Sequence, residues 1–211
     1  MQTLYDNPDT YIYEKMKQFR LVDMREQYDA LIAEAENDGL SYKDFLIRLL
    51  QTEDEGKTNR KHEKLLNKAS FDSSKRLSEI DYGFNPSLDR DRIEELGKLH
   101  FLQRHENVII IGSPGVGKSM IATGIGINAC NQGHRVLFVN VKELIDTLET
   151  ELQEETLQPF LKKLSKIELL IIDELSYINM DKEKESLFFQ IIRQRYEKSS
   201  LIVTTNLPIG R

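Results

Sequence analysis

The sequence predicts an α/β domain with a parallel sheet between two layers of helices, preceded by a small all-helical domain. Four apolar runs of strand length indicate the sheet, at 107–111, 135–140, 169–173 and 201–205. Helical stretches separate them, and strands that are apolar on both faces are typical of parallel sheets covered on both sides. Before position 70 the apolar residues follow helical spacing instead. We expect the helical domain at 1–76 and the α/β domain at 77–211.

Composition excludes several classes of protein. Of the 211 residues, 39% are hydrophobic and 30% are charged, which is typical of a folded soluble domain. The longest apolar run, 107–112, is too short to cross a bilayer, and residues 1–20 lack the apolar core of a secretory signal. The single cysteine, Cys130, excludes an internal disulfide and a cysteine-rich zinc module, and we expect it to pack rather than react. We therefore expect a cytoplasmic protein without a membrane partner.

Helices are expected from the start of the chain, after a loose arm over residues 1–10 that Asn7-Pro8 would keep irregular. Helical spacing runs from about 11 to 69, and Gly39 ends one helix inside that stretch. Ser41 and Asp44 fit a capping box that begins the next one.

A connector, LSEIDYGFNPSLDR, follows at 77–90. Ser87 or Asp89 is expected to cap a further helix that continues to about Arg104. Beyond that helix the apolar runs of the sheet begin.

Charge is unevenly distributed along an acidic chain whose formal net charge is −6. Seven basic residues gather within 57–76 against only two acidic ones, Glu63 and Asp72. These are Lys57, Arg60, Lys61, Lys64, Lys68, Lys75 and Arg76. Such a stretch is a candidate for contact with the phosphate backbone of DNA, which needs no base specificity. The alternative is an ordinary solvated helix face.

The segment after the first apolar run has the pattern G-x-x-x-x-G-K-[ST] of a phosphate-binding loop. Its glycines allow backbone N–H groups to surround phosphates, at the positive end of the following helix. We expect Lys118 to reach the β- and γ-phosphates of ATP and the Ser119 hydroxyl to bind Mg²⁺. The expected nucleotide contacts are Gly112, Ser113, Pro114, Gly115, Val116, Gly117, Lys118, Ser119 and Met120. An ordinary glycine-rich turn is the alternative.

Two carboxylates follow the third apolar run, LLIIDE. An acid at the carboxyl end of a buried parallel strand lies where open α/β sheets bind their ligands. Asp173 is the expected partner of Mg²⁺, and Glu174 is expected to orient or polarise the attacking water. Alone, such a pair is also compatible with a solvated turn.

The fourth apolar run ends in Thr205 and Asn206. In ATPases with this arrangement, the strand with the polar tip lies between the phosphate-loop strand and the acidic strand. Asn206 is then expected to face the γ-phosphate and its water. Otherwise Asn206 only begins a turn before Pro208.

The chain resembles the IstB-like ATP-binding proteins of insertion sequences, relatives of the DnaC-type helicase loaders within the AAA+ ATPases. The resemblance rests on MKQFRLVDM and LSYKDFLIRLL in the helical domain, ENVIIIGSPGVGKS at the loop, and FFQIIRQRYE followed by TTNLP. It implies a P-loop NTPase fold of AAA+ type and an ATPase that binds duplex DNA and assists a transposase. It also implies a homo-oligomer when ATP and DNA are bound.

One departure from the family pattern lies at the end of the chain. Family members continue with another strand and a lid that carry an arginine finger and a second sensing arginine. Here the sequence stops at Arg211, so we expect a C-terminally shortened member in which 107–111 is an exposed edge strand. Because arginine fingers contribute about 10³ to 10⁵ to phosphoryl-transfer rates, nucleotide binding is expected to survive better than turnover.

Four further residues have two interpretations each. Tyr82 and Phe84 lie in the connector that passes near the adenine in relatives, or they are packing aromatics. Arg193 and Arg195 face a neighbouring subunit or DNA, or they are ordinary surface residues.

The sequence is compatible with other functions. One is a helicase loader in DNA replication, although the version with an N-terminal zinc domain is incompatible with a single cysteine. Another is a non-hydrolysing module whose ATP state controls oligomer formation. A small-molecule kinase fits poorly, because no substrate-binding lid is visible.

Overall fold

A computed structural model describes residues 7–71, 75–83, 85–177 and 180–206. The chain forms two compact units, Met1–Lys61 and His62–Arg211. The boundary expected between 76 and 77 falls inside the second unit. The reason is that Leu65, Leu66 and Ala69, at the end of a long helix, pack in the core of the second unit.

The first unit is helical, as the periodicity predicts. It contains α1 (Pro8–Gln18), α2 (Val22–Asp38) and most of α3 (Tyr42–Ala69). The prediction of a loose arm was wrong at Asn7-Pro8, because this pair begins α1 instead of interrupting it. The Asn7 side chain accepts the N–H groups of Asp9 and Thr10, and the missing N–H of Pro8 costs nothing at a first helical position.

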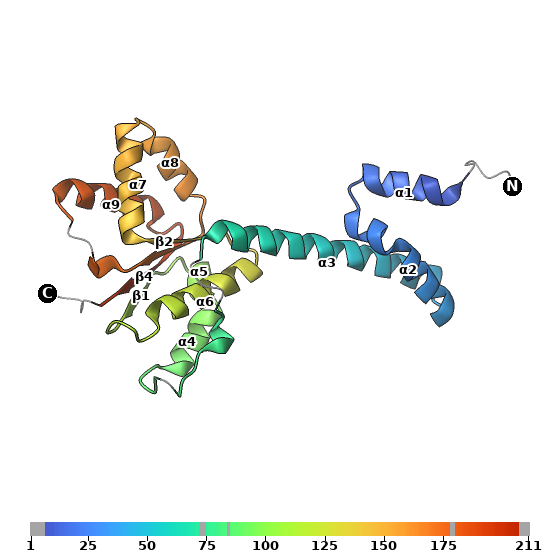
Figure 1. Cartoon of the computed structure of the whole chain (residues 1–211), viewed down its shortest axis with the longest axis horizontal. Helices are drawn as coiled ribbons and strands as arrows, with labels where there is room; N and C mark the ends of the chain where they lie inside the picture. The colour runs from blue at the N-terminus through green and yellow to red at the C-terminus, as the bar shows by residue number, and fades with distance from the viewer. Residues whose placement is uncertain (1–6, 72–74, 84, 178–179, 207–211) are drawn as a thin grey trace. The chain divides into compact units, whose positions relative to one another are not determined.

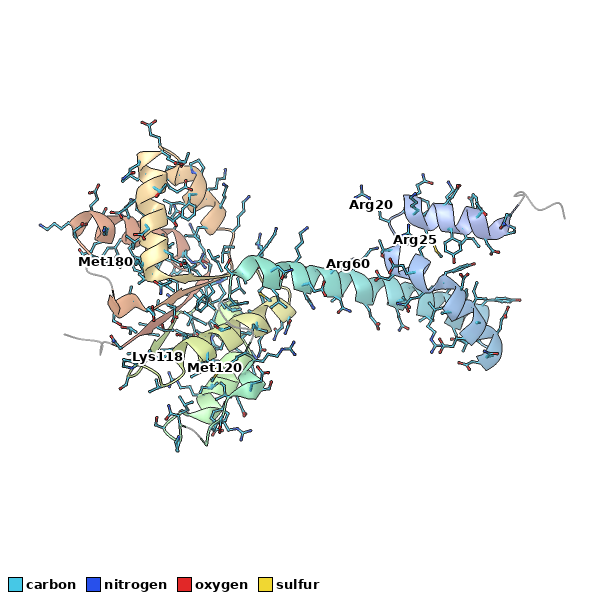
Figure 2. The ribbon with its side chains drawn as sticks, in the orientation of Figure 1. Arg20, Arg25, Arg60, Lys118, Met120 and Met180 are labelled. Atoms are coloured by element: carbon cyan, nitrogen blue, oxygen red, sulfur yellow. The ribbon has the colours of Figure 1, made fainter. Side chains whose placement is uncertain are left out.

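A buried carboxylate joins α2 to α3 in this unit. Glu53, on α3, is only 3% exposed and accepts the N–H groups of Asp23 and Met24 at the start of α2, at 3.0 and 3.2 Å. Arg60, which is labelled in Figure 2, adds an ion pair with Asp23. Gly56 allows the close approach, because a Cβ there would lie 2.0 Å from the Asp23 carboxyl carbon.

The second unit contains a four-stranded parallel sheet in the order β1-β4-β3-β2, which confirms the predicted fold class (Figure 1). Its strands are β1 (Val108–Ile111), β2 (Val136–Asn140), β3 (Leu169–Asp173) and β4 (Ser200–Thr205). All five residues of β3 are buried, as a central strand of a covered sheet requires. The polar-tipped strand, β4, lies between β1 and β3 as expected.

Helices cover both faces of this sheet (Figure 1). One layer consists of α4 (Arg90–Gly97), α5 (His100–Gln103) and α6 (Lys118–Asn131), and the other of α7 (Val141–Gln153), α8 (Leu157–Leu164) and α9 (Lys182–Arg195). Short 3₁₀ turns lie at Leu77–Glu79 and Leu175–Tyr177. A hydrophobic core lies on each face of the sheet, and successive residues of β3 point to opposite faces. Ile171 packs with α6, and Ile172 packs with α7 and α9.

The helix expected between Ser87 or Asp89 and Arg104 is broken in two. Asp89 caps it by accepting the N–H of Arg92. The chain then turns at Leu99, whose φ of 67° ends the helical path and whose side chain is buried. The turn lets α5 place Phe101 and Leu102 in the same core.

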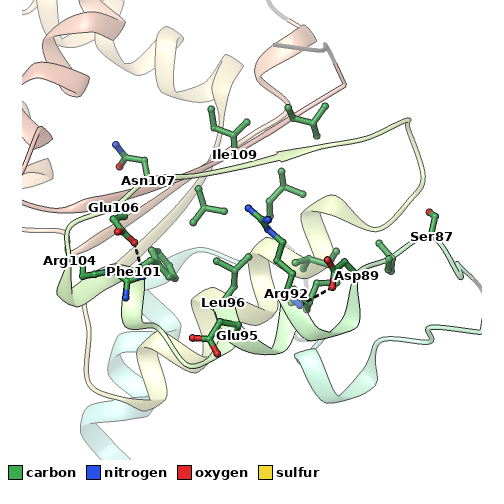
Figure 3. Close-up of a pocket in the computed structure, with 16 residues that line it drawn as sticks. Ser87, Asp89, Arg92, Glu95, Leu96, Phe101, Arg104, Glu106, Asn107 and Ile109 are labelled. Carbon is green, nitrogen blue, oxygen red and sulfur yellow. Dashed lines mark hydrogen bonds and ion pairs between the residues drawn. The ribbon is translucent and has the colours of Figure 1, made fainter.

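β1 forms one edge of the described sheet, as expected for 107–111. Ile109 and Ile111 are 53% and 44% exposed there. A groove of about 660 Å³ runs between this edge and helices α4 and α5, with Leu96 and Phe101 on its helical side (Figure 3). An apolar edge of this kind offers unpaired backbone groups to another strand.

Arg195 was expected at the surface or facing a partner, and the structure contradicts this expectation. The side chain is buried and donates to the carbonyls of Leu164 and Ser200, at 3.1 and 2.9 Å. Burial lowers the pKa of Arg195 to about 10. Arg193, two residues earlier, is exposed.

Cys130, on α6, packs in the core, as expected, and burial raises the pKa of its thiol to about 11. Among the described residues, no helix combines the length and apolar character needed to span a membrane.

Candidate nucleotide site

The predicted phosphate loop connects β1 to α6. Gly115 and Gly117 take φ values of 80° and 94°, in the left-handed region that favours glycine. Gly117 is the residue before the first turn of α6, so the free N–H groups of that turn point toward the space that the loop encloses. This conformation suits a backbone that surrounds an anion.

Lys118 is held inside the loop that carries it. Its ammonium donates to the carbonyls of Gly112 and Ser113, at 2.8 and 2.9 Å. The lysine is therefore ordered beside the place where the backbone N–H groups converge.

Asp173 ends β3 and is buried. Its Oδ1 accepts the hydroxyl of Ser119 at 3.0 Å, although the two residues are 54 positions apart in the chain. The same oxygen accepts the hydroxyl of Thr204, at the end of β4. The structure thus joins the two side chains that were expected to bind Mg²⁺.

Glu174 follows β3 with a φ of 62°, which is uncommon for a residue other than glycine. Its exposed carboxylate accepts the side-chain amide of Asn140 at 2.7 Å. Asn140 ends β2 and lies beside Asp173 in the sheet register. It also caps α7 by accepting the N–H of Lys142 at 2.9 Å.

Sequence reasoning missed Asn140. The signal was a polar residue at the end of an apolar strand, the same feature that singled out Asn206.

Asn206 lies just after β4, between the loop strand and the acidic strand. Its N–H donates to the Ser176 hydroxyl at 3.2 Å. Its side-chain Oδ1 is buried and has no hydrogen-bond partner among the described residues. A buried amide left in this way is available to a bound group.

Part of the predicted set lines one cavity of about 280 Å³ at the carboxyl ends of the strands, whereas Gly112, Ser113, Val116 and Asp173 are not among its lining residues. From the predicted set it contains Pro114, Gly115, Gly117, Lys118, Ser119, Met120, Glu174 and Asn206, and it adds Ser176, Thr204 and Thr205. Figure 2 marks Lys118 and Met120 at the start of α6. The cavity joins an ammonium, loop N–H groups, a carboxylate and an unpaired amide oxygen, which together suit a phosphate chain with its metal ion.

The predicted connector residues are only partly near this cavity. The Asn85 amide donates to the Val116 carbonyl at 3.3 Å, so the connector touches the phosphate loop. Tyr82 instead faces the Arg90 guanidinium, 5.3 Å from its ring, and is not among the lining residues. Phe84 lies outside the described residues.

The basic residues predicted to contact DNA are not among the residues that line the cavity, and their contacts differ. Lys57 and Arg60 form ion pairs with Glu53, at 3.4 and 3.6 Å. Lys61, Lys64 and Lys68 are exposed along α3, and Lys75 and Arg76 are exposed beyond it.

A family model for IstB-like ATP binding proteins matches residues 14–211. The chain belongs to the IstB-like ATP-binding protein family. The match covers both the helical unit and the P-loop unit of this IstB-like chain. The comparison confirms the resemblance found in the motifs.

Among curated relatives, an ATP-binding protein of insertion sequence IS21 from Pseudomonas aeruginosa is 42% identical over 178 residues. That alignment covers 84% of the IstB-like chain and 67% of the relative. One from insertion sequence IS5376 of Geobacillus stearothermophilus is 34% identical, with 94% and 79% covered. The homologues of this chain are therefore ATP-binding proteins of insertion sequences.

Solved structures place the IstB-like chain among AAA+ P-loop proteins. The DnaC helicase loader superposes with a TM-score of 0.53 at 25% identity and covers 70% of this chain and 81% of its own. DnaA from Aquifex aeolicus, bound to AMPPCP, gives a TM-score of 0.58 at 18% identity. The chain spans 43% of the length of that DnaA structure.

Proposed function

We propose that this chain is an ATP- and DNA-binding accessory ATPase of a transposase. The observation that carries the proposal is the single cavity in which the phosphate loop, the carboxylate of Glu174 and the amide of Asn206 meet. The insertion-sequence origin of the relatives supports the transposase as partner.

ATP binding would use groups that are already in place. The N–H groups of the loop and the first turn of α6 would surround the phosphates, and Lys118 would transfer its hydrogen bonds from loop carbonyls to phosphate oxygens. Mg²⁺, when bound, would neutralise charge on the phosphate oxygens. Ser119 and Asp173, which are hydrogen-bonded to each other, would hold it.

Hydrolysis would depend on Glu174 and Asn206, which line the same cavity from neighbouring strands. Glu174 would accept a proton from, or orient, the attacking water, and Asn206 would position that water against the terminal phosphate. In the described arrangement the Glu174 carboxylate is engaged by Asn140. We propose that this bond opens before turnover.

DNA binding and assembly are the further parts of the proposal. The exposed Lys61, Lys64 and Lys68 follow one another at helical spacing on α3, so they present their charges on one face. Duplex DNA is the partner that suits such a face, and ATP and DNA together would favour assembly of several copies.

Steady-state ATP turnover, with and without duplex DNA, tests the proposal. Wild-type turnover that rises with DNA and is lost in Glu174→Gln supports it. A Lys118→Ala variant provides the binding control, because it should lose nucleotide affinity rather than only turnover. Failure of the wild-type chain to bind Mg-ATP would overturn the proposal.

A helicase loader is the second candidate, and the likeness to DnaC favours it. Pull-down with the replicative helicase and with the transposase separates the two, because each function requires its own partner. Mg-ATP binding with oligomer formation but no turnover above Glu174→Gln would indicate the non-hydrolysing module instead.

A further inference from the structure

The hydroxyl of Thr204 connects the two acidic residues of the site. Thr204 is 1% exposed at the end of β4. Its Oγ1 donates to Asp173 Oδ1 and accepts the backbone N–H of Glu174, the latter at 3.0 Å. One side chain of the neighbouring strand therefore holds both the carboxylate of the first acid and the backbone of the second.

The bond to Glu174 acts at a strained point of the backbone. A φ of 62° is disfavoured for a residue with a Cβ and persists when surrounding contacts fix it. The N–H of Glu174 is satisfied by Thr204, 30 positions away, so the hydroxyl helps to maintain this conformation. The conformation in turn aims the Glu174 side chain at the cavity and at Asn140.

The bond to Asp173 differs from the one that Ser119 makes to the same oxygen. Ser119 is the hydroxyl expected to turn to Mg²⁺, and its bond to Asp173 would then be lost. Thr204 donates from the neighbouring strand β4 rather than from the loop, so its bond to Asp173 does not depend on the position of Ser119. It can therefore keep the carboxylate oriented while Ser119 changes partner.

The hydroxyl of Ser176 makes a second connection between β4 and the segment that follows β3. The N–H of Asn206 donates to Ser176 at 3.2 Å, so the tip of β4 and the segment 173–176 are joined at both ends. Asn206 and Glu174 are thus held in register with each other.

We infer that Thr204 is a positioning residue that fixes Asp173 for the metal ion and Glu174 for the attacking water, an inference that rests on the proposed ATPase function. Thr204 lines the cavity, but its hydroxyl is engaged by the two acids. Its contribution acts through the two acids, as the groups behind metal ligands commonly do.

The test compares Thr204→Val, which keeps the shape and removes the hydroxyl, with Thr204→Ser, which keeps the hydroxyl. Ser200→Ala is the matched control, because it removes a buried hydroxyl from the other end of the same strand. Fluorescent-ATP binding in EDTA, and turnover as a function of Mg²⁺ concentration, are measured for each protein. If Thr204→Val does not fold, Thr204→Ala takes its place.

Thr204→Val should lose turnover or apparent Mg²⁺ affinity by about 10- to 100-fold, a larger loss than any change in its binding of nucleotide in EDTA. Thr204→Ser should restore most of the loss, and Ser200→Ala should show none. Wild-type turnover and Mg²⁺ dependence in Thr204→Val would overturn the inference, as would an equal loss in Ser200→Ala. Failure of the wild type to bind Mg-ATP would overturn the proposed function, and this inference with it.

Discussion

Asn140 performs two tasks with one amide, and the tasks use different atoms. Its Oδ1 caps α7, and its Nδ2 donates to Glu174. A substitution can therefore remove one task while keeping the other, because Asp is as good a helix cap as Asn.

We expect Asn140→Asp to keep α7 intact and to reduce ATP turnover by 10-fold or more. The new carboxylate would face that of Glu174 and repel it, which disturbs the group that orients the water. Asn140→Ser provides the control, since serine caps the helix without adding charge. Steady-state turnover beside circular dichroism measures the two tasks separately. Equal turnover in Asn140→Asp and the wild type would show that Glu174 does not depend on this neighbour.

Arg195 is the most unusual buried residue of the second unit, because its charge is partnered by carbonyl groups alone among the contacts described. We expect Arg195→Lys to lower the stability of that unit by about 1–3 kcal/mol, since a shorter ammonium cannot reach the carbonyls of both Leu164 and Ser200. Arg193→Lys, on the exposed face of the same helix, should change stability by less than about 0.5 kcal/mol. Hydrogen exchange of the β4 amides measures the stability change in both variants. Matching effects of the two variants would contradict the structural role.

At the scale of elements, α2 and α3 approach each other closely at Gly56, where no larger residue fits. Alanine at position 56 would gain helix propensity of about 1 kcal/mol, but its Cβ would meet the Asp23 carboxyl. Arg60 holds that carboxyl in place, so it cannot simply rotate away.

We therefore expect Gly56→Ala to destabilise the first unit in the wild-type background and to stabilise it in an Asp23→Ala background. A change in the sign of the stability effect between the two backgrounds separates the clash with Asp23 from the gain in helix propensity. Hydrogen exchange at the start of α2 reports the local stability. The same sign in both backgrounds would mean that Asp23 does not limit the approach of the helices.

Elements with local signals were predicted from sequence with little error. The phosphate loop and the strand at 169–173 fall where their patterns placed them, because apolar run length and glycine positions are local properties. The start of α1 was mistaken for a break, since Asn-Pro is compatible with both a turn and a capped helix start. The break at Leu99 depends on burying α5 in the core, which no local pattern shows.

Contacts across the sheet could not be predicted in the same way. The bonds from Asn140 to Glu174 and from Thr204 to Asp173 join residues 34 and 31 positions apart. They exist because parallel strands end at one edge of the sheet, and the order of those strands came from the family resemblance rather than from the residues. The contact between Glu53 and the start of α2 was also missed, because it too joins residues far apart in the sequence.

At the scale of the whole molecule, the proposed DNA binding requires a local basic surface, because the chain as a whole is acidic, with a net charge of −6. Within the predicted basic stretch, Lys57 and Arg60 are already partnered by Glu53, whereas Lys61, Lys64 and Lys68 have no ion pair among the described residues. The last three are therefore the better candidates for phosphate contact.

We expect the triple variant Lys61→Gln, Lys64→Gln and Lys68→Gln to bind duplex DNA more weakly and with a flatter dependence on salt. Each lost phosphate contact reduces the slope of log K against log salt by about 0.9, so a reduction of roughly 2 to 3 is expected. The control replaces Lys162, Lys163 and Lys166 by Gln, which removes the same charge from α8 and its end. An equal effect of both triple variants would show that only net charge matters.

The lysine inside the phosphate loop has a consequence for how its loss should be interpreted. The Lys118 ammonium joins the carbonyls of Gly112 and Ser113, so alanine at this position would remove these bonds within the loop as well as a positive charge beside a bound phosphate. An affinity measured for Lys118→Ala would therefore combine a cost in the free protein with a cost in the complex. Comparing the exchange rates of the loop amides in the two empty proteins would separate these contributions before any nucleotide is added.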